Sequence, residues 1–173
     1  MVGLAVAVTA ASAQFTTVAP FTAVPFTLTP MAVLLTAAVL GSRLGALAQV
    51  AYVLVGAAGL AVFSPSATLP PGVLRLAGPT GGYLLAYPLA AFATGWLAER
   101  GWDRRYLTSV AAMCVGLAVI YLGGVAWLTV AFTGSLSTAL TFGLAQFVAL
   151  DLVKIAVAAA ILPSAWKLVR SNG

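Results

Sequence analysis

The sequence predicts an all-α integral membrane protein with six transmembrane helices, an interpretation that rests on three observations. Hydrophobic residues make up 62% of the 173-residue chain and charged residues only 6%. The mean hydropathy is +1.11. Apolar stretches approach the roughly 20 residues that a spanning helix needs, and they recur along the chain. Because soluble domains are about one quarter charged, we expect a single transmembrane domain over residues 1–173.

The apolar stretches place the six helices in order along the chain. We expect spans over residues 2–19, 30–41, 44–62, 81–98, 106–123 and 139–165. The second span is short and bounded by Pro25 and Pro30, so its approach is extended or re-entrant and lies against protein or a cavity. The segment AASAQ at 10–14 resembles a signal-peptide cleavage site, but the preceding residues carry no positive charge, which argues against cleavage.

The charges indicate the orientation in the membrane. An even number of spans puts both termini on one side, and that side carries every loop charge except Arg75. The charged positions on that side are Arg43, residues 99–105, Lys167 and Arg170. By the positive-inside rule both termini are cytoplasmic, so the excess of 8 Lys and Arg over 3 Asp and Glu indicates topology rather than nucleic-acid binding. The long loops 20–29, 63–79 and 124–138 then face outward, where a ligand pocket would be built.

The segment FVALDLVKI, residues 147–155, places Asp151 and Lys154 inside the last span, roughly midway along it. A charge at that depth costs several kcal/mol and faces a partner or a cavity. The i, i+3 spacing puts both groups on one helical face, close enough to pair. The pair is either a self-neutralising structural feature or a site for a polar ligand that carries both donors and acceptors, and we favour the ligand site.

The sequence lacks the residues that several other classes of function require. The chain has no histidine, one cysteine (Cys114) and no GxxxxGK[ST] phosphate loop, so we expect no His-zinc site, no disulfide and no ATP site. An intramembrane aspartyl protease needs two paired carboxylates, but Glu99 and Asp103 lie in a loop. A proton relay would need a chain of titratable partners. We therefore predict a small, cofactor-free binder that depends on an outside source of energy.

Small residues on the first span indicate helix packing. Ala5, Thr9 and Ala13 lie four apart, as do Ala7 and Ala11. Small residues at this spacing let two helices approach closely, although alanine is abundant enough for the pattern to arise by chance. The sequence does not show which of the two faces would contact a partner.

Four segments and one residue pair resemble the BioY family, the biotin-specific substrate-binding (S) components of energy-coupling-factor (ECF) transporters. The segments are VPFTLTPMAVLL at 24–35, YVLVGAAGLAVF at 52–63, AGPTGGYLLAYPLAAFATGWLAER at 77–100 and VIYLGGVAWLT at 119–129. The pair is Asp151 with Lys154. The resemblance implies a six-helix bundle in a bacterial or archaeal cytoplasmic membrane, with a biotin pocket near its outer side. It also implies a transmembrane coupling subunit (T component), with two ATPase subunits, that docks on small residues of the first helix.

The resemblance implies a role for each candidate residue at the ligand. Asp151 would accept hydrogen bonds from the ureido N–H groups of biotin and Lys154 would donate to the ligand. Arg75 is either the partner of the valerate carboxylate or a solvated loop charge. The remaining candidates are the stiff-loop residues Gly78, Thr80 and Gly81, and the aromatic wall Tyr52, Tyr83 and Tyr87.

Two departures from the family pattern qualify these roles. Thr29 stands where the family commonly has glutamine, so a polar contact there is shortened or lost. Ala149 and Leu150 replace a Pro-Gly pair, so we expect a more regular helix before Asp151. Two alternatives stay open, namely an S component for thiamine or riboflavin and, less favoured, an intramembrane enzyme using Lys154 with Ser135 or Ser137.

Overall fold

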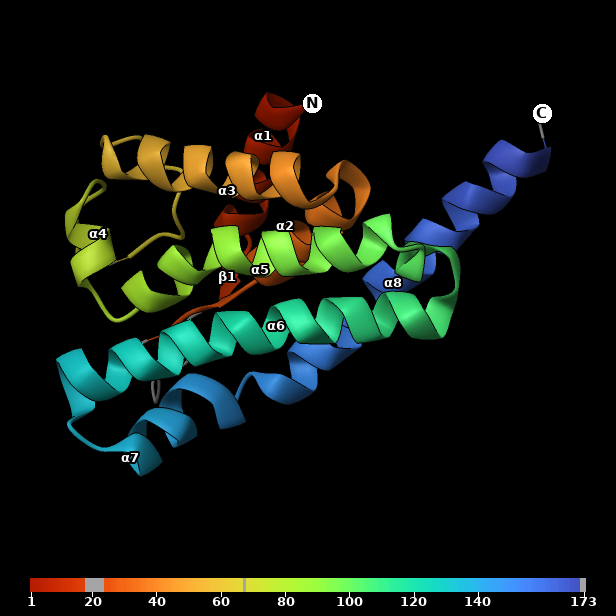
Figure 1. The fold of residues 1–173 in the computed structure, drawn as a ribbon. Helices are drawn as coiled ribbons and strands as arrows, with labels where there is room; N and C mark the ends of the chain where they lie inside the picture. Colours follow the sequence, from red (N-terminus) through yellow and green to blue (C-terminus); the bar gives the residue numbers. More distant parts are fainter. Residues whose placement is uncertain (18–23, 67, 172–173) are drawn as a thin grey trace.

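The protein is a bundle of helices with one two-residue β-ladder (Figure 1). The computed structural model describes residues 1–17, 24–66 and 68–171. The long helices are α1 (Val2–Gln14), α2 (Thr29–Leu40), α3 (Ser42–Ala57), α5 (Gly81–Glu99), α6 (Tyr106–Leu128) and α8 (Val148–Ser171). The short elements are α4 (Leu74–Ala77), α7 (Leu136–Leu140), the 3-10 turn η1 (Trp102–Arg104) and the π-helical segments η2 (Thr129–Thr133) and η3 (Thr141–Ala145).

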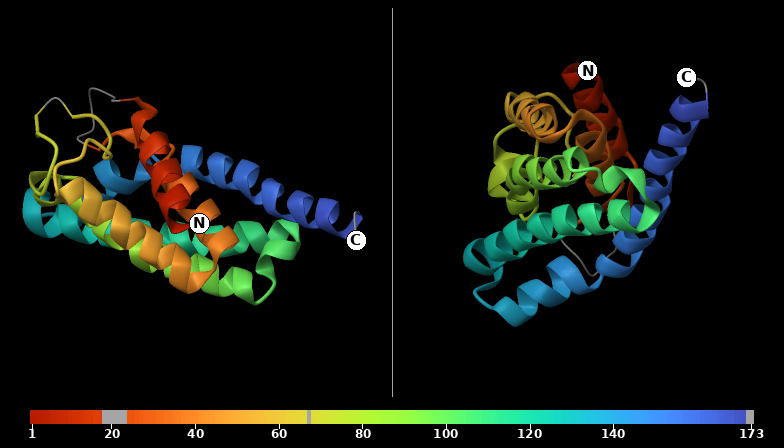
Figure 2. Two further views of the ribbon diagram at one scale, coloured as in Figure 1. Left: turned by 90° about the horizontal axis from the view of Figure 1, so that it is seen from above. Right: turned by 45° about the vertical axis from the view of Figure 1, so that its right-hand side comes forward.

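Helix α5 lies at the centre of the bundle, against α2, α3 and α6. Helix α8 packs on α6 and α2, and α1 packs on α2 and α3. Figure 2 shows α1 crossing the α2–α3 hairpin while the chain returns through α8 beside α6. The core between these helices is apolar and includes the fully buried Val33, Leu34 and Ala90. Large side chains such as Leu107 and Leu122 are exposed on the outer surface, as expected where lipid replaces water.

The turn between α2 and α3 depends on glycine. Gly41 has a φ of 83°, which residues with a side chain rarely adopt. Gly95 on α5 lies directly against this turn, since a Cβ there would be 2.5 Å from the Gly41 carbonyl carbon. The Glu99 carboxylate accepts the Ser42 N–H at 2.7 Å and its hydroxyl at 3.0 Å. The acid therefore caps the N-terminus of α3 and ties the α2–α3 hairpin to the end of α5.

Helix α1 is shorter than the sequence predicts. It ends at Gln14 rather than near residue 19, because the chain then becomes extended in β1 (Thr16–Thr17). This strand pairs antiparallel with β2 (Phe26–Thr27), with Thr16 opposite Thr27. The ladder holds the approach to α2 in an extended conformation, as expected from Pro25 and Pro30.

The expectation of one continuous helix over 139–165 is wrong. The structure has α7 and η3, then a break, then α8, and the two arms are bent by 40°. The Tyr83 hydroxyl donates to the Gly143 carbonyl at 2.6 Å, and Phe147 N–H bonds to Leu144 rather than to Gly143. Because of the break, Asp151 lies in the first turn of α8 rather than midway along a long helix.

Few of the described helices are long enough to span a membrane by themselves. The helix Tyr106–Thr133 is 28 residues long with a mean hydropathy of 2.1. The bent pair Leu136–Ala145 and Val148–Pro163 passes the same length and hydropathy test only when taken together. Among the described residues, Val2–Gln14, Thr29–Leu40 and Ser42–Ala57 are apolar but shorter. The count of six spans therefore stays a prediction.

Candidate functional site

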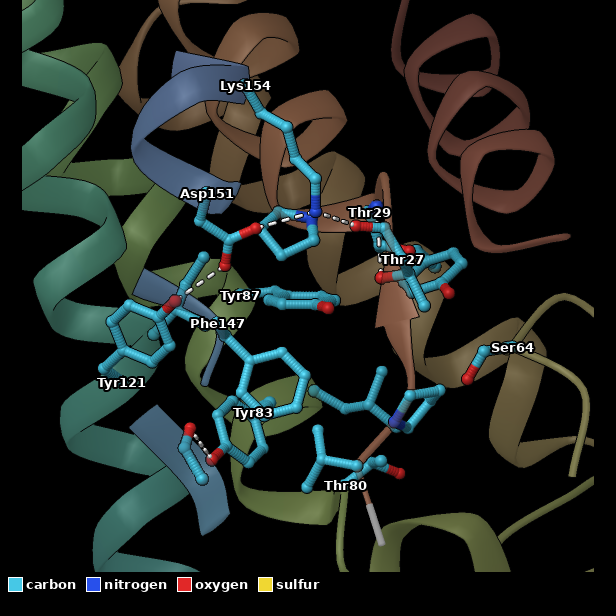
Figure 3. A pocket seen from close by; sticks show the side chains of 17 residues that line it. Thr27, Thr29, Ser64, Thr80, Tyr83, Tyr87, Tyr121, Phe147, Asp151 and Lys154 are labelled. Atoms are coloured by element: carbon cyan, nitrogen blue, oxygen red, sulfur yellow. Dashed lines mark hydrogen bonds and ion pairs between the residues drawn. The ribbon is translucent and has the colours of Figure 1, made fainter. Parts of the chain in front are cut away.

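A pocket lies among the ladder, α5, α6 and the start of α8, and seven sequence-predicted residues line it (Figure 3). These seven are Thr29, Tyr52, Thr80, Tyr83, Tyr87, Asp151 and Lys154. The other lining residues are Val24, Pro25, Thr27, Pro30, Ser64, Leu84, Ile120, Tyr121, Gly143, Phe147. The walls are mainly apolar and aromatic, with a few convergent polar groups, which is the usual composition of a small-molecule site.

A continuous hydrogen-bonded chain crosses one end of the pocket. Tyr121 donates its hydroxyl to Asp151 Oδ2 at 2.7 Å. Lys154 Nζ pairs with Asp151 Oδ1 at 2.8 Å and donates to the Thr27 carbonyl at 2.8 Å. Figure 3 shows these three bonds in line, from α6 through α8 to β2. The chain therefore ties the loop that approaches α2 to the two helices on the far side of the pocket.

The position of Asp151 stabilises its negative charge. Asp151 is 6% exposed and lies in the first turn of α8, where the N-terminal end of the helix dipole favours an anion. Lys154 one turn later supplies the counter-charge, and its side chain is 18% exposed. Because removing a charge from water costs several kcal/mol unless it is paired and hydrogen-bonded, the pair is stable here only as a unit.

The two partners leave capacity for a ligand. A carboxylate offers about four lone-pair positions and an ammonium three donors. Among the described residues, each Asp151 oxygen accepts one hydrogen bond. Lys154 donates two, one to Asp151 and one to the Thr27 carbonyl. The pair can therefore present further acceptor positions and one further donor to a molecule in the pocket.

Aromatic rings form the middle of the pocket. Tyr87 lies beside the ring of Tyr52, with ring centroids 6.4 Å apart, and Phe147 packs against Phe26 of β2 with centroids 4.3 Å apart and the rings tilted by 35°. The hydroxyl of Tyr52 donates to the Val62 carbonyl at 3.1 Å. Since this hydroxyl is bound to the backbone, Tyr52 presents mainly its ring to the pocket.

Of the three stiff-loop residues predicted to contact the ligand, which are Gly78, Thr80 and Gly81, only Thr80 lines the pocket. Gly78 and Gly81 lie behind it in a tight turn, in which the Gly81 N–H donates to the Gly78 carbonyl at 3.0 Å. A Cβ on Gly81 would collide with the Leu76 carbonyl. The glycines therefore shape the loop, whereas the threonine side chain faces the site.

Arg75 is neither in the pocket lining nor solvated. It is 5% exposed and donates to the Ser64 carbonyl and, at 3.5 Å, to the Leu69 carbonyl. It lines a neighbouring cavity that shares Ser64 with the first pocket. Burial lowers the pKa of the Arg75 guanidinium from its ordinary value, and Coulomb interaction with Tyr52 opposes this. The group stays charged, since arginine does not deprotonate in proteins.

The sequence did not identify several residues that the structure brings to the site. Tyr121 completes the hydrogen-bonded chain, Thr27 contributes a main-chain carbonyl, and Ser64 and Phe147 line the pocket. Tyr121 lies in the segment VIYLGGVAWLT, where the apolar surroundings of its hydroxyl were the available signal. A main-chain carbonyl such as that of Thr27 has no signal in the sequence.

The two faces of α1 have different surroundings. Ala5, Thr9 and Ala13 are buried against the bundle, and Gln49 of α3 donates to the Thr9 hydroxyl at 3.2 Å. Ala7 and Ala11 are exposed. The small-residue face available to another molecule is therefore the one that carries Ala7 and Ala11.

Comparisons with known proteins point to one family. A family model described as the BioY family matches residues 1–171. The chain is similar to the biotin transporter BioY of Thermotoga maritima, at 42% identity over 142 residues, covering 82% of this chain and 80% of that protein. It is also similar to the probable biotin transporter BioY of Pyrococcus horikoshii, at 41% identity over 162 residues, covering 93% and 91%.

A solved structure has the same fold. It is the crystal structure of the S-component for biotin from an ECF-type ABC transporter, and the two superpose with a TM-score of 0.84. They share 21% sequence identity over 96% of this chain and 88% of the other. The likeness establishes the helical architecture in which the pocket lies.

Proposed function

This chain belongs to the BioY family, and from that membership and the pocket geometry we propose that it binds biotin and serves its uptake as the S component of an ECF transporter. The observation that carries the proposal is the hydrogen-bonded chain of Tyr121, Asp151, Lys154 and the Thr27 carbonyl. The chain of charges and donors lies at one end of an otherwise apolar pocket, where it suits a ligand that is polar at one end and apolar along its body.

The ureido ring of biotin has two N–H donors and one carbonyl acceptor. In the proposed complex Asp151 accepts from a ureido N–H group, and Lys154 gives its remaining donor to the adjacent ureido carbonyl. Hydrogen bonds to charged groups are worth about 1.5–3 kcal/mol each. The pair therefore supplies both orientation and much of the affinity at this end.

The apolar body of biotin would lie between Tyr87, Phe147 and Tyr83, which face the pocket (Figure 3). Aromatic rings offer large apolar contact surfaces with little loss of conformational entropy. The valerate chain would extend toward Thr80 and Ser64, away from the charged pair. Thr29, buried in the lining, completes the wall on the α2 side.

We propose that six spans cross a bacterial or archaeal cytoplasmic membrane, with both termini cytoplasmic. The pocket lies at the end of the bundle where α5 begins, and the basic residues Arg100, Arg104 and Arg105 follow the end of α5. The positive-inside rule then places the pocket toward the outer side. The irregular backbone between η3 and α8 lies against other parts of the protein. Irregular backbone at membrane depth is tolerated only where protein or a cavity surrounds it.

We also propose that the exposed face of α1 docks on a T component that holds two ATPase subunits. The face carries Gly3, Ala7 and Ala11 at intervals of four residues, all exposed. Small side chains at this spacing let a second helix approach closely. The buried Ala5 and Ala13 serve the packing of α1 inside the chain.

Biotin binding to the purified, detergent-solubilised chain tests the proposal directly. We expect saturable binding that excess thiamine or riboflavin does not displace, and recovery of unchanged biotin by mass spectrometry. Displacement by either vitamin would favour an S component of different specificity. A modified ligand, or an adduct on Ser135 or Ser137, would contradict the transporter assignment.

We predict that Arg75→Gln weakens biotin and biotin methyl ester to the same extent, by roughly five- to thirtyfold, or about 1–2 kcal/mol. The guanidinium donates to the Ser64 and Leu69 carbonyls, so its loss disturbs the loop rather than a contact with the valerate. Arg100→Gln, at the far end of α5, is the control and should bind normally. Loss of affinity for biotin with unchanged affinity for the ester would show instead that Arg75 reads the carboxylate.

A further inference from the structure

The Gly78 carbonyl accepts two hydrogen bonds from different elements. One comes from the Gly81 N–H within the turn, at 3.0 Å. The other comes from the indole Nε1 of Trp127 on α6, at 2.9 Å. The Trp127 side chain therefore attaches the turn that begins α5 to α6.

The close approach of α5 and α6 brings the indole to this turn. A Cβ on Gly82 would collide with the Cβ of Trp127, and a Cβ on Gly123 would lie 3.0 Å from the Gly82 carbonyl. Only glycine at both positions leaves the α6 backbone near enough for Trp127 to reach back to residue 78. Trp127 itself is half-buried and lines a groove on the outer surface rather than the ligand pocket.

The attached turn carries one wall of the pocket. Thr80 lies between the two bonded residues, Gly78 and Gly81, and its side chain lines the pocket. Its carbonyl accepts from the Leu84 N–H at 3.1 Å, which begins the helical bonding of α5. A shift of the Gly78 carbonyl is therefore transmitted to Thr80 through two rigid peptide units.

We propose that Trp127 is a positioning residue for the ligand site, which holds the 78–81 turn so that Thr80 closes the pocket wall. The identity of the ligand rests on the proposed function, whereas the attachment of the turn by Trp127 does not. Trp127→Phe removes the N–H donor and keeps an aromatic ring in the outer groove. Trp96→Phe is the matched control, because Trp96 lies near the other end of α5 and is 43% exposed.

Hydrogen exchange of the ligand-free protein tests the attachment without any ligand. The Gly81 amide is protected by its bond within the turn, so we expect several-fold faster exchange over residues 78–84 in Trp127→Phe than in wild type, with no change in Trp96→Phe. Exchange of α8 amides should be unaffected in both variants. Equal exchange of the 78–84 segment in wild type and Trp127→Phe would overturn the proposal, whatever the ligand is.

Biotin dissociation then tests the consequence for the site. Loss of one neutral hydrogen bond suggests roughly three- to tenfold weaker binding, and we expect the change in the dissociation rate because the loosened turn releases the ligand sooner. A merely structural role would lower the melting temperature and leave the dissociation rate unchanged, which would contradict the inference. Wild-type chain that fails to bind biotin would contradict the proposed function instead, and the exchange result would still decide the role of Trp127.

Discussion

Asp151→Asn should reduce biotin affinity by about 1.5–3 kcal/mol, roughly ten- to 150-fold. The amide keeps the size of the side chain but has one acceptor oxygen in place of two. Tyr121 and Lys154 both donate to the carboxylate in the present arrangement. An NH₂ group facing Lys154 or a ureido N–H would oppose another donor, and one facing Tyr121 would require its hydroxyl to turn and accept instead. In each orientation the ligand also loses a charged acceptor, so the loss exceeds that of a single neutral bond. Titration of the purified variant with labelled biotin measures it.

The matched control is Asp103→Asn. Asp103 is 9% exposed, so it is also a buried carboxylate, but it lies in η1 at the opposite end of α5 from the pocket. We expect this variant to bind biotin as wild type does. Binding by Asp151→Asn within threefold of wild type would move the site away from α8, most directly toward the 78–81 turn and Thr80.

A fold defect can be separated from a binding defect by removing both charges. Asp151→Asn leaves Lys154 without its counter-ion, which destabilises a buried pair by about 3–5 kcal/mol when one partner is removed. The double variant Asp151→Asn with Lys154→Gln leaves no unpaired charge at this pair and should recover much of the thermal stability. It should still bind biotin poorly, because neither the carboxylate nor the ammonium is present. Recovery of binding would show that the pair is structural.

The helix starts that the sequence predicted best are those with local signals. The glycines of the 78–82 turn mark the start of α5 at Gly81, and the charged loop before Tyr106 marks the start of α6. The break before α8 has no such signal. At this break the Tyr83 hydroxyl donates to the Gly143 carbonyl, a bond that joins residues far apart in the chain. Contacts of this kind override local helix propensity and are visible only in the folded molecule.

The residues of the candidate site also differ in whether the sequence carried a local signal for them. Asp151 and Lys154 were identified because charges inside an apolar span are costly enough to need a reason. Tyr121 and the Thr27 carbonyl, which complete their bonding, looked like any other tyrosine and loop residue. Arg75 was singled out as the charge in the outward loops, but the direction of its side chain was not predictable from the sequence. Only the fold shows that its guanidinium points to the Ser64 and Leu69 carbonyls.

Ala11→Leu should reduce biotin uptake by cells at least about tenfold while the purified chain binds biotin as wild type does. Leucine is a strong helix former, and Ala11 is exposed on α1, so the fold of the chain should be unaffected. A larger side chain would, however, hold the backbone of a partner helix away from α1, where close approach supplies the contact energy between membrane helices. The loss should therefore appear in uptake and in co-purification of the T component.

Ala118→Leu is the matched control, since Ala118 is an exposed alanine in the middle of α6 and should tolerate the same change in both assays. Ala7→Leu should behave like Ala11→Leu, because the two positions share one face of α1. Ala13→Leu should behave differently, because Ala13 is 1% exposed and overpacking a helix interface typically costs about 1–3 kcal/mol of stability. If Ala7→Leu and Ala11→Leu both support normal uptake, the exposed face of α1 contacts lipid and the coupling subunit docks elsewhere. If uptake falls together with biotin binding, the face acts on the pocket rather than on a partner.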